Sequence, residues 1–460
     1  MTDQHKTRSR FSRRRFLIFG GGVVAALGGA AYGLRRRLWA KLSSWTRLDA
    51  FSATPPLRPH DPRRDRRKIY LSRGKTPAAN IDAVLEKMGG IEKIVGKDDV
   101  VLIKVSAQWW NQGMTNVAAV KRVIEQILAI EGFAGEVVVF ENTHFRLADG
   151  SGLSRAWTHP SARNVDVEGW TKLGDLIDHF KNFDAPVSFV GLVDAGPNEL
   201  AEGTWHDPGR AHGVYGGDGR GPIAPGETRD GYHWDFARAF RLKRSWVDHA
   251  QTPLSWPVFT SPRSGLVIDF KDGVIKREGE KRVPAQRKLT WINMTTANQH
   301  NDTGFTGCCK SAMGVVDMSA GWLGTDPRVR GYQSVHFFGF PDALWRMAGP
   351  LADLAKRVRA PDLYLAVAEW IAATPKSGWR EGADIRIEES SAFRKRTVVA
   401  GTDPVAIDSW CVRNLLMPIG GADRGIYDLD DDDSMVVKFL RYYREVHGAG
   451  TLDPALIEVV

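Results

Sequence analysis

Apolar and polar positions alternate in a regular rhythm through the chain from residue 68 onward. Short apolar runs typical of strands are separated by segments whose apolar residues recur every three to four positions, as in a helix. Strand patterns lie at residues 68–72, 100–105 and 136–141, with helix patterns between them at residues 80–88 and 117–130. Further strand patterns follow at residues 265–270, 289–294, 363–368 and 397–400. This alternation predicts an α/β fold with a mostly parallel sheet and flanking helices.

The rhythm lapses between about residues 191 and 256, where Gly, Pro, His and Trp dominate. A loop of this length inside a compact domain is usually a lid, an insertion or a binding surface. We therefore expect a long irregular insertion here. Its histidines, His206, His212 and His233, are irregularly spaced, so we interpret them as loop residues rather than as a set of metal ligands.

Residues 1–34 form a leader of distinct composition. Its Ser-Arg-Arg-Arg-Phe-Leu sequence at residues 12–17 resembles the twin-arginine export signature, and a mild apolar run follows to residue 34. The twin-arginine translocase is therefore a predicted partner, and the folded body is expected to be extracytoplasmic, or periplasmic in a Gram-negative cell. The apolar run is close to the minimum length of a membrane span, so it is either a cleaved signal or an anchor in the cytoplasmic membrane.

The charge of the chain is concentrated next to this leader. Residues 1–68 hold 17 Lys and Arg against 4 Asp and Glu, whereas the rest of the chain holds 46 basic and 50 acidic side chains. We read residues 35–67 as a basic, Pro-rich linker and residues 68–460 as the α/β domain. Since this domain is slightly acidic, its charge gives no support for binding nucleic acid.

Polar side chains follow the strand pattern at residues 136–141, where Glu141 and His144 lie close together in the sequence. The carboxyl ends of strands in an open α/β sheet are where ligands bind, so both are candidates for acid/base catalysis or metal ligation. Lys104 lies at the same end of the strand at residues 100–105. It either contributes to a ligand site or forms a structural ion pair with an acid such as Glu141.

A second candidate segment runs from residue 298 to residue 317. Its polar turn contains His300 and Asp302, and Thr306 and Gly307 precede a helix start that carries Lys310. Free backbone N–H groups at a helix start, with a lysine nearby, are typical of an anion-binding site. The alternative is a tight turn with a solvated lysine.

A third segment, residues 398–408, ends a strand and begins a helix. Asp403 directly before a proline is typical of an N-cap residue. Asp408 falls on an apolar face of this helix, where an unpaired carboxylate is costly, so we expect a cation, a hydroxyl or a metal as its partner.

Three cysteines, Cys308, Cys309 and Cys411, are too few for a disulfide framework and contain no C-x-x-C pair. The sequence therefore holds no self-sufficient iron-sulfur or zinc motif. Buried free thiols are the favoured interpretation, and the alternatives are a vicinal disulfide between Cys308 and Cys309 or a soft metal shared with Cys411.

Three motifs together resemble the uncharacterised family called domain of unknown function 362. They are Val-Leu-Ile-Lys at residues 101–104, Thr-Gly-Cys-Cys-Lys-Ser-Ala-Met-Gly at residues 306–314 and Gly-Thr-Asp-Pro-Val-Ala-Ile-Asp at residues 401–408, and the similarity spans about residues 68–417. Some members of that family are fused to ferredoxin-type iron-sulfur modules, which implies redox-linked chemistry. This chain departs from the family where Asn298 and Gln299, instead of Lys and Thr, precede His300.

These patterns lead to one principal hypothesis and two alternatives. The principal one is an exported enzyme, redox-linked or assisted by a divalent metal, that acts on a small anionic substrate. Its catalytic residues would be Glu141, His144, His300 and Asp302, and its ligand-binding residues Lys104, Thr306, Gly307, Lys310 and Asp408. The alternatives are a binding protein for a small anion or metal, and a membrane-tethered scaffold that joins a redox partner protein.

Overall fold

A computed structural model describes most of the chain after residue 66. The described residues are 67–107, 113–142, 164–193, 214–216, 231–241, 251–300, 303–317, 335, 343–372 and 392–460. All of them belong to one compact unit that spans residues 59–460. The leader and most of the predicted linker lie outside the described residues, so the export signal stays a prediction.

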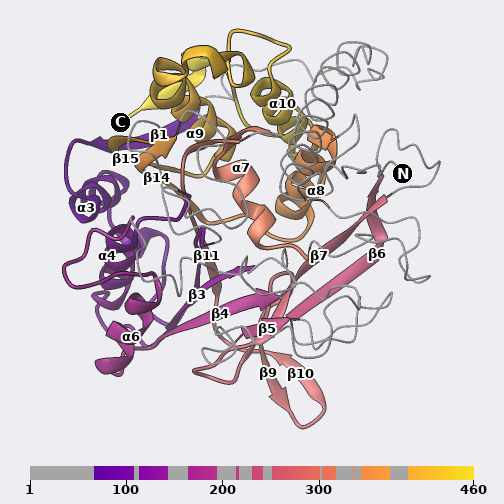
Figure 1. Ribbon diagram of the computed structural model, residues 1–460. Coiled ribbons are helices and arrows are strands. Elements are labelled where there is room, and N and C mark those ends of the chain that lie inside the picture. The colour runs from indigo at the N-terminus through magenta and orange to yellow at the C-terminus, as the bar shows by residue number, and fades with distance from the viewer. Residues whose placement is uncertain are drawn as a thin grey trace, which may run out of the picture. The chain divides into compact units, whose positions relative to one another are not determined.

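A nine-stranded sheet forms the centre of the described fold (Figure 1). In spatial order its strands are β16 (Ile457–Val459), β1 (Arg67–Arg73), β15 (Ala392–Gly401), β14 (Leu363–Ala372), β11 (Leu289–Thr295), β2 (Val100–Lys104), β3 (Glu136–Asn142), β4 (Val187–Val193) and β5 (Val214–Gly216). Every neighbouring pair is parallel except the two pairs that β15 forms with β1 and β14. The predicted mostly parallel α/β fold is confirmed.

Helices cover both faces of this sheet. The helices α3 (Pro77–Met88), α4 (Val117–Leu128) and α6 (Gly174–Asn182) share one apolar core with alternate strand residues such as Val101 and Val139. The helices α7 (Cys308–Ser311), α8 (Ala343–Arg357), α9 (Pro404–Cys411) and α10 (Met435–His447) share the other core with residues of opposite parity, such as Leu102 and Phe140. Period-two alternation places these strand residues on opposite faces, and both faces are apolar because both are covered.

The predicted start of α9 is confirmed. Asp403 has an extended backbone, and its side chain accepts hydrogen bonds from the backbone N–H groups of Val405 and Ala406, while Pro404 begins the helix. Arg67 in β1 donates to the second carboxylate oxygen of Asp403 at 3.0 Å. The cap therefore also ties α9 to the first described strand.

A second sheet is antiparallel and has five strands, in the order β10 (Lys281–Pro284), β9 (Gly273–Glu278), β8 (Val267–Asp269), β7 (Gln251–Thr260) and β6 (Gly231–Arg241). Phe270 links it to the large sheet, because its ring makes edge contacts with Phe140 and Trp291. Strands β5 and β6 and the start of β7 lie within residues 191–256, so the predicted insertion is not irregular throughout. Strand β7 contains Pro253 and Pro257, which argue against a strand in the sequence, and its pairing with β6 is irregular between Asp235 and Phe240.

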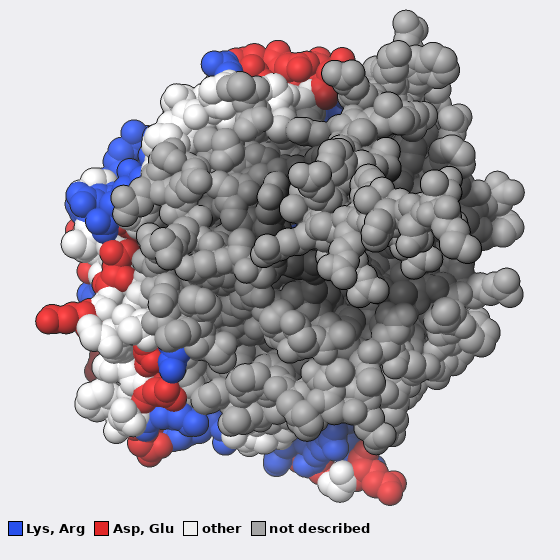
Figure 2. All heavy atoms as spheres, viewed as in Figure 1, with Lys and Arg blue, Asp and Glu red and all other residues white. Residues whose placement is uncertain are grey.

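Acidic and basic side chains are interspersed on the described surface in Figure 2. Acidic side chains gather at the top of the view, over the turn that precedes α10. Several of the carboxylates in this turn pair with basic side chains: Asp430 with Arg413, Asp432 with Arg441, and Asp433 with Lys438. Among the described residues, none of the helices has the length and apolar character needed to span a membrane.

Candidate functional site

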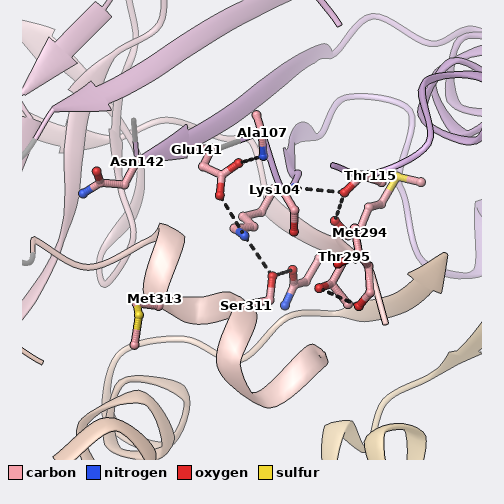
Figure 3. Close-up of polar contacts among 12 residues, drawn as sticks. Lys104, Ala107, Thr115, Glu141, Asn142, Met294, Thr295, Ser311 and Met313 are labelled. Atoms are coloured by element: carbon pink, nitrogen blue, oxygen red, sulfur yellow. Dashed lines mark hydrogen bonds and ion pairs between the residues drawn. The ribbon is translucent and has the colours of Figure 1, made fainter. Parts of the chain in front are cut away.

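The ends of two neighbouring strands bring Lys104 and Glu141 together. Lys104 ends β2 and is in register with Phe140 of β3, so Glu141 is the next residue along β3. The Lys104 ammonium Nζ lies 3.4 Å from Glu141 Oε1, and both side chains are almost fully buried, at 2% and 6% exposure. The other carboxylate oxygen of Glu141 accepts the backbone N–H of Ala107 (Figure 3). The pair is thus the ion-pair alternative that the sequence suggested, at the predicted edge of the sheet.

Burial changes the pKa of both side chains in the direction that favours their uncharged forms. Loss of solvent raises the pKa of Glu141 to about 7, although Lys104 and the Ala107 N–H counteract the shift. The same loss of solvent lowers the pKa of Lys104, and Glu141 opposes that change. Burial therefore makes the charged form of each group less favourable, and the carboxyl of Glu141 can gain or lose a proton near neutral pH.

Ser311 and Asn293 extend this pair into a hydrogen-bonded chain. Lys104 Nζ donates to Ser311 Oγ at 2.9 Å (Figure 3). Ser311 Oγ donates in turn to Asn293 Oδ1 at 2.9 Å. The amide nitrogen Nδ2 of Asn293 is buried and has no hydrogen-bond partner. Neither residue was among the candidates that the sequence indicated. The available signals were a polar residue inside the apolar strand at residues 289–294 and a serine directly after Lys310 in the same motif.

Lys310 adds a second positive charge next to this chain. It lies on the last turn of α7, is half-buried, and its Nζ is 3.7 Å from Met313 Sδ. Its charge lowers the pKa of Glu141, as the charge of Lys104 does. Two ammonium groups therefore act on one carboxylate, and the local charge is positive when all three groups are ionised. An arrangement of this kind favours an anionic ligand.

Gly314 allows the backbone after α7 to pass close to the Lys104–Glu141 pair. It ends a short 3₁₀ turn, Ala312–Gly314, that continues from α7. A Cβ atom on Gly314 would lie 2.6 Å from Lys104 Cε and 2.8 Å from Glu141 Oε1, distances that real Cβ atoms do not show. Only glycine fits here without moving the pair. Packing against the site therefore explains why the motif at residues 306–314 ends in glycine.

The start of α7 is capped by Asp408. The carboxylate of Asp408 accepts the backbone N–H of Cys308 at 2.7 Å and that of Cys309 at 2.9 Å. These are N–H groups on which the anion-binding prediction depended, and in the structure the protein's own carboxylate occupies them. Two partners of Asp408 are therefore backbone amides, which were not among the partners that we expected. A Cβ atom on Gly307 would lie 2.3 Å from Asp408 Oδ1, which explains the glycine at this position.

Asp408 is also an unusual acid. It is 1% exposed, and burial raises its pKa to about 7 even though the two amides and the thiols of Cys308 and Cys309 favour its ionised form. The three cysteines around it are buried free thiols, as predicted, and burial together with Asp408 raises their pKa well above the usual range. In the described part of the chain, no group of three or more His, Cys, Asp or Glu side chains is arranged to hold a metal ion.

The remaining predicted site residues lie in a two-stranded hairpin or outside the described residues. His300 ends β12 (Asn298–His300), is half-buried, and belongs to a two-stranded hairpin with β13 (Gly304–Thr306). Thr306 pairs with Asn298 in the same hairpin. His144 and Asp302 lie outside the described residues. The structure thus joins Lys104, Glu141 and Lys310, while Asp408 and Gly307 stabilise the opposite end of α7.

A family model described as a domain of unknown function (DUF362) matches residues 285–413. This segment, which is less than half of the chain, contains β11, α7, β14, β15 and α9, and with them Asn293, Ser311 and Asp408. Lys104 and Glu141 lie before it. Searches among curated proteins and among solved structures gave no significant match. The resemblance seen in the sequence is therefore supported over residues 285–413.

Proposed function

We propose that this chain is an exported enzyme that transfers protons on a small anionic substrate at the carboxyl edge of its large sheet. The observation that carries the proposal is the buried Lys104–Glu141 pair, with Nζ and Oε1 3.4 Å apart. A catalytic acid or base works best when its pKa is near the working pH, and burial moves the pKa of Glu141 to about 7.

Charge supports the anionic nature of the substrate. The charges of Lys104 and Lys310 both lower the pKa of Glu141. Protonation of this carboxyl removes its negative charge, so the local potential becomes more positive and favours a substrate anion. Export through the twin-arginine route is supported by the leader sequence, and that route carries folded cargo. Participation of a metal or redox group through His144, His300 or Asp302 remains a part of the hypothesis that rests on the sequence alone.

The first experiment is a thermal-shift screen of the full-length protein against small carboxylates, phosphate and sulfate. We expect at least one anion to raise Tm. Because Lys310→Met removes one positive charge, this variant should need an anion concentration about tenfold higher for the same rise in Tm. Lys438→Met is the matched control, because Lys438 pairs with Asp433 on the surface. A screen without any stabilising anion would contradict the anionic substrate.

The second experiment separates an enzyme from a binding protein. The stabilising compounds are incubated with the protein in D₂O and followed by NMR for hydrogen exchange at carbon or for product. The enzyme hypothesis predicts a change with the wild type, and binding without change in Glu141→Gln. Binding by the wild type with the compound left intact would instead identify a binding protein.

A further inference from the structure

The hydrogen-bonded chain at the sheet edge has the parts of a nucleophilic site. Ser311 Oγ is 2.9 Å from Lys104 Nζ, and Glu141 lies on the other side of the same lysine. A hydroxyl within hydrogen-bond reach of a base, with the base oriented by a third group, is the general arrangement of an activated nucleophile. Serine–lysine pairs perform this role in other enzymes when the lysine is neutral.

Asn293 supplies the fourth part. Its Oδ1 accepts from Ser311 Oγ at 2.9 Å, and its Nδ2, bonded to the same amide carbon, is a buried donor without a partner. An unsatisfied buried donor is costly and rare in a folded protein. Nδ2 belongs to the amide whose oxygen contacts Ser311 Oγ, so it is a donor beside the attacking oxygen that can serve the negative oxygen developing on an attacked carbonyl.

We propose that Ser311 is a nucleophile that accepts an acyl group from a small anionic ester or thioester, with Lys104 as its base and Asn293 as the donor to the developing oxyanion. This inference rests on the proposed function for the identity of the substrate anion, which Lys310 would recognise. The nucleophilic part rests on the contacts of Ser311 alone.

The reaction has two balanced halves. The Ser311 hydroxyl turns its proton from Asn293 Oδ1 to the neutral amine of Lys104. Ser311 Oγ then attacks the carbonyl carbon and its proton passes to that amine, while the carbonyl electrons move to the oxygen that faces Asn293 Nδ2. The carbonyl then re-forms as the bond from the carbonyl carbon to the leaving group breaks. The leaving group, an alcohol from an ester or a thiol from a thioester, takes the proton from Lys104. Water attacks the acyl-serine with Lys104 again as base, and the products are a carboxylic acid and the restored Ser311 hydroxyl.

Burial, and not Glu141, favours the form of Lys104 that can act as a base, since ionised Glu141 raises the pKa of the lysine. In the neutral form of the pair the carboxyl holds the proton, so the amine has a lone pair for the hydroxyl proton of Ser311. Burial of both groups supports that form. Gly314 leaves space for the pair, because a Cβ atom at this position would overlap both side chains.

The test compares two activated esters with full-length protein, p-nitrophenyl acetate and the anionic mono-p-nitrophenyl succinate. We expect a burst of p-nitrophenolate and an acyl group on Ser311 by mass spectrometry. Ser311→Ala should lose both, whereas Ser409→Ala is the matched control, since Ser409 is also buried but donates to the Leu452 carbonyl. Ser311→Cys retains a nucleophile at the position and should be acylated on sulfur.

Lys104→Arg distinguishes a base from a structural partner. Arginine keeps a donor for Ser311 but stays protonated, so acylation should fall by about a hundredfold or more. Acylation of Ser311→Ala at the wild-type rate, or no acyl group on Ser311 in the wild type, would overturn the proposal. Equal rates with the two esters, unaffected by Lys310→Met, would contradict only the anionic substrate and leave the role of Ser311 intact.

Discussion

The carboxylate of Asp408 accepts the backbone N–H of Cys308 at 2.7 Å, although the two residues are 100 positions apart in the sequence. This contact, with the similar one to Cys309, fixes the start of the helical turn whose other end holds Lys310 and Ser311. A buried carboxylate that caps a distant helix thus positions one side of the candidate site. The consequences for stability can be measured.

Asp408→Asn should destabilise the protein. An amide side chain has one acceptor oxygen, so one of the two backbone N–H groups would face an NH₂ group and lose its partner. A buried donor without a partner costs about 1–3 kcal/mol. Urea unfolding at pH 8 measures this loss. Asp453→Asn is the control, because Asp453 caps an exposed turn that asparagine caps equally well. Wild-type stability of Asp408→Asn would show that the cap is dispensable.

The contribution of Asp408 and Glu141 to the stability of the wild type should fall between about pH 4 and pH 7. The pKa of Asp408 rises from 3.8 to about 7 on folding, and that of Glu141 rises from 4.5 to about 7. In this window the unfolded state has released protons that the folded state keeps, so increasing pH favours unfolding. Above about pH 7 both states are ionised and these contributions become constant. The lowered pKa of Lys104 acts in the opposite direction, at alkaline pH.

Asp408→Asn isolates one of these two contributions. Its free energy of unfolding should depend less steeply on pH than that of the wild type over the same window, since asparagine does not titrate. Urea unfolding at several values between pH 4 and pH 7.5 gives both curves. Parallel curves for the two proteins would mean that Asp408 keeps an ordinary pKa in the folded state.

The sequence predicted those parts of the fold whose signals are local. Strands β2 and β3 and helix α4 follow directly from hydrophobic periodicity, and the cap at Asp403 follows from the proline after it. Strands β6 and β7 pair with each other in the structure. The sequence did not predict them, because hydrophobic periodicity is weak where Gly, Pro and Trp dominate.

The site was predictable in location but not in its contacts. Strand ends indicated Lys104 and Glu141, since parallel strands align their carboxyl ends. The partner of Lys104 on α7, Ser311, is 207 residues away, and nothing in the local sequence relates the two. The amides that Asp408 accepts could not be foreseen for the same reason, because backbone groups of a distant helix leave no pattern in the sequence.

Gly314→Ala should disturb the Lys104–Glu141 pair. The new methyl group would lie within 3 Å of both side chains. Such overpacking typically lowers the free energy of unfolding by about 1–3 kcal/mol. Gly425→Ala is the matched control, since a Cβ atom there meets nothing within 4 Å. Urea unfolding compares the two variants. Equal stability would mean that the pair moves aside without cost.

Lys104→Met should raise the pKa of Glu141 further. Methionine matches the length of the lysine stem but removes the charge that stabilises the ionised carboxylate, whereas the burial that raises the pKa remains. Infrared difference spectra between pH 5 and pH 9 report the protonated carboxyl of Glu141, which Glu141→Gln identifies by its loss. We expect the titration to move to higher pH in Lys104→Met. An unchanged midpoint would show that Lys104 does not control the proton of Glu141, and both the proton-transfer pair and the role of Lys104 as a base would then lose their physical basis.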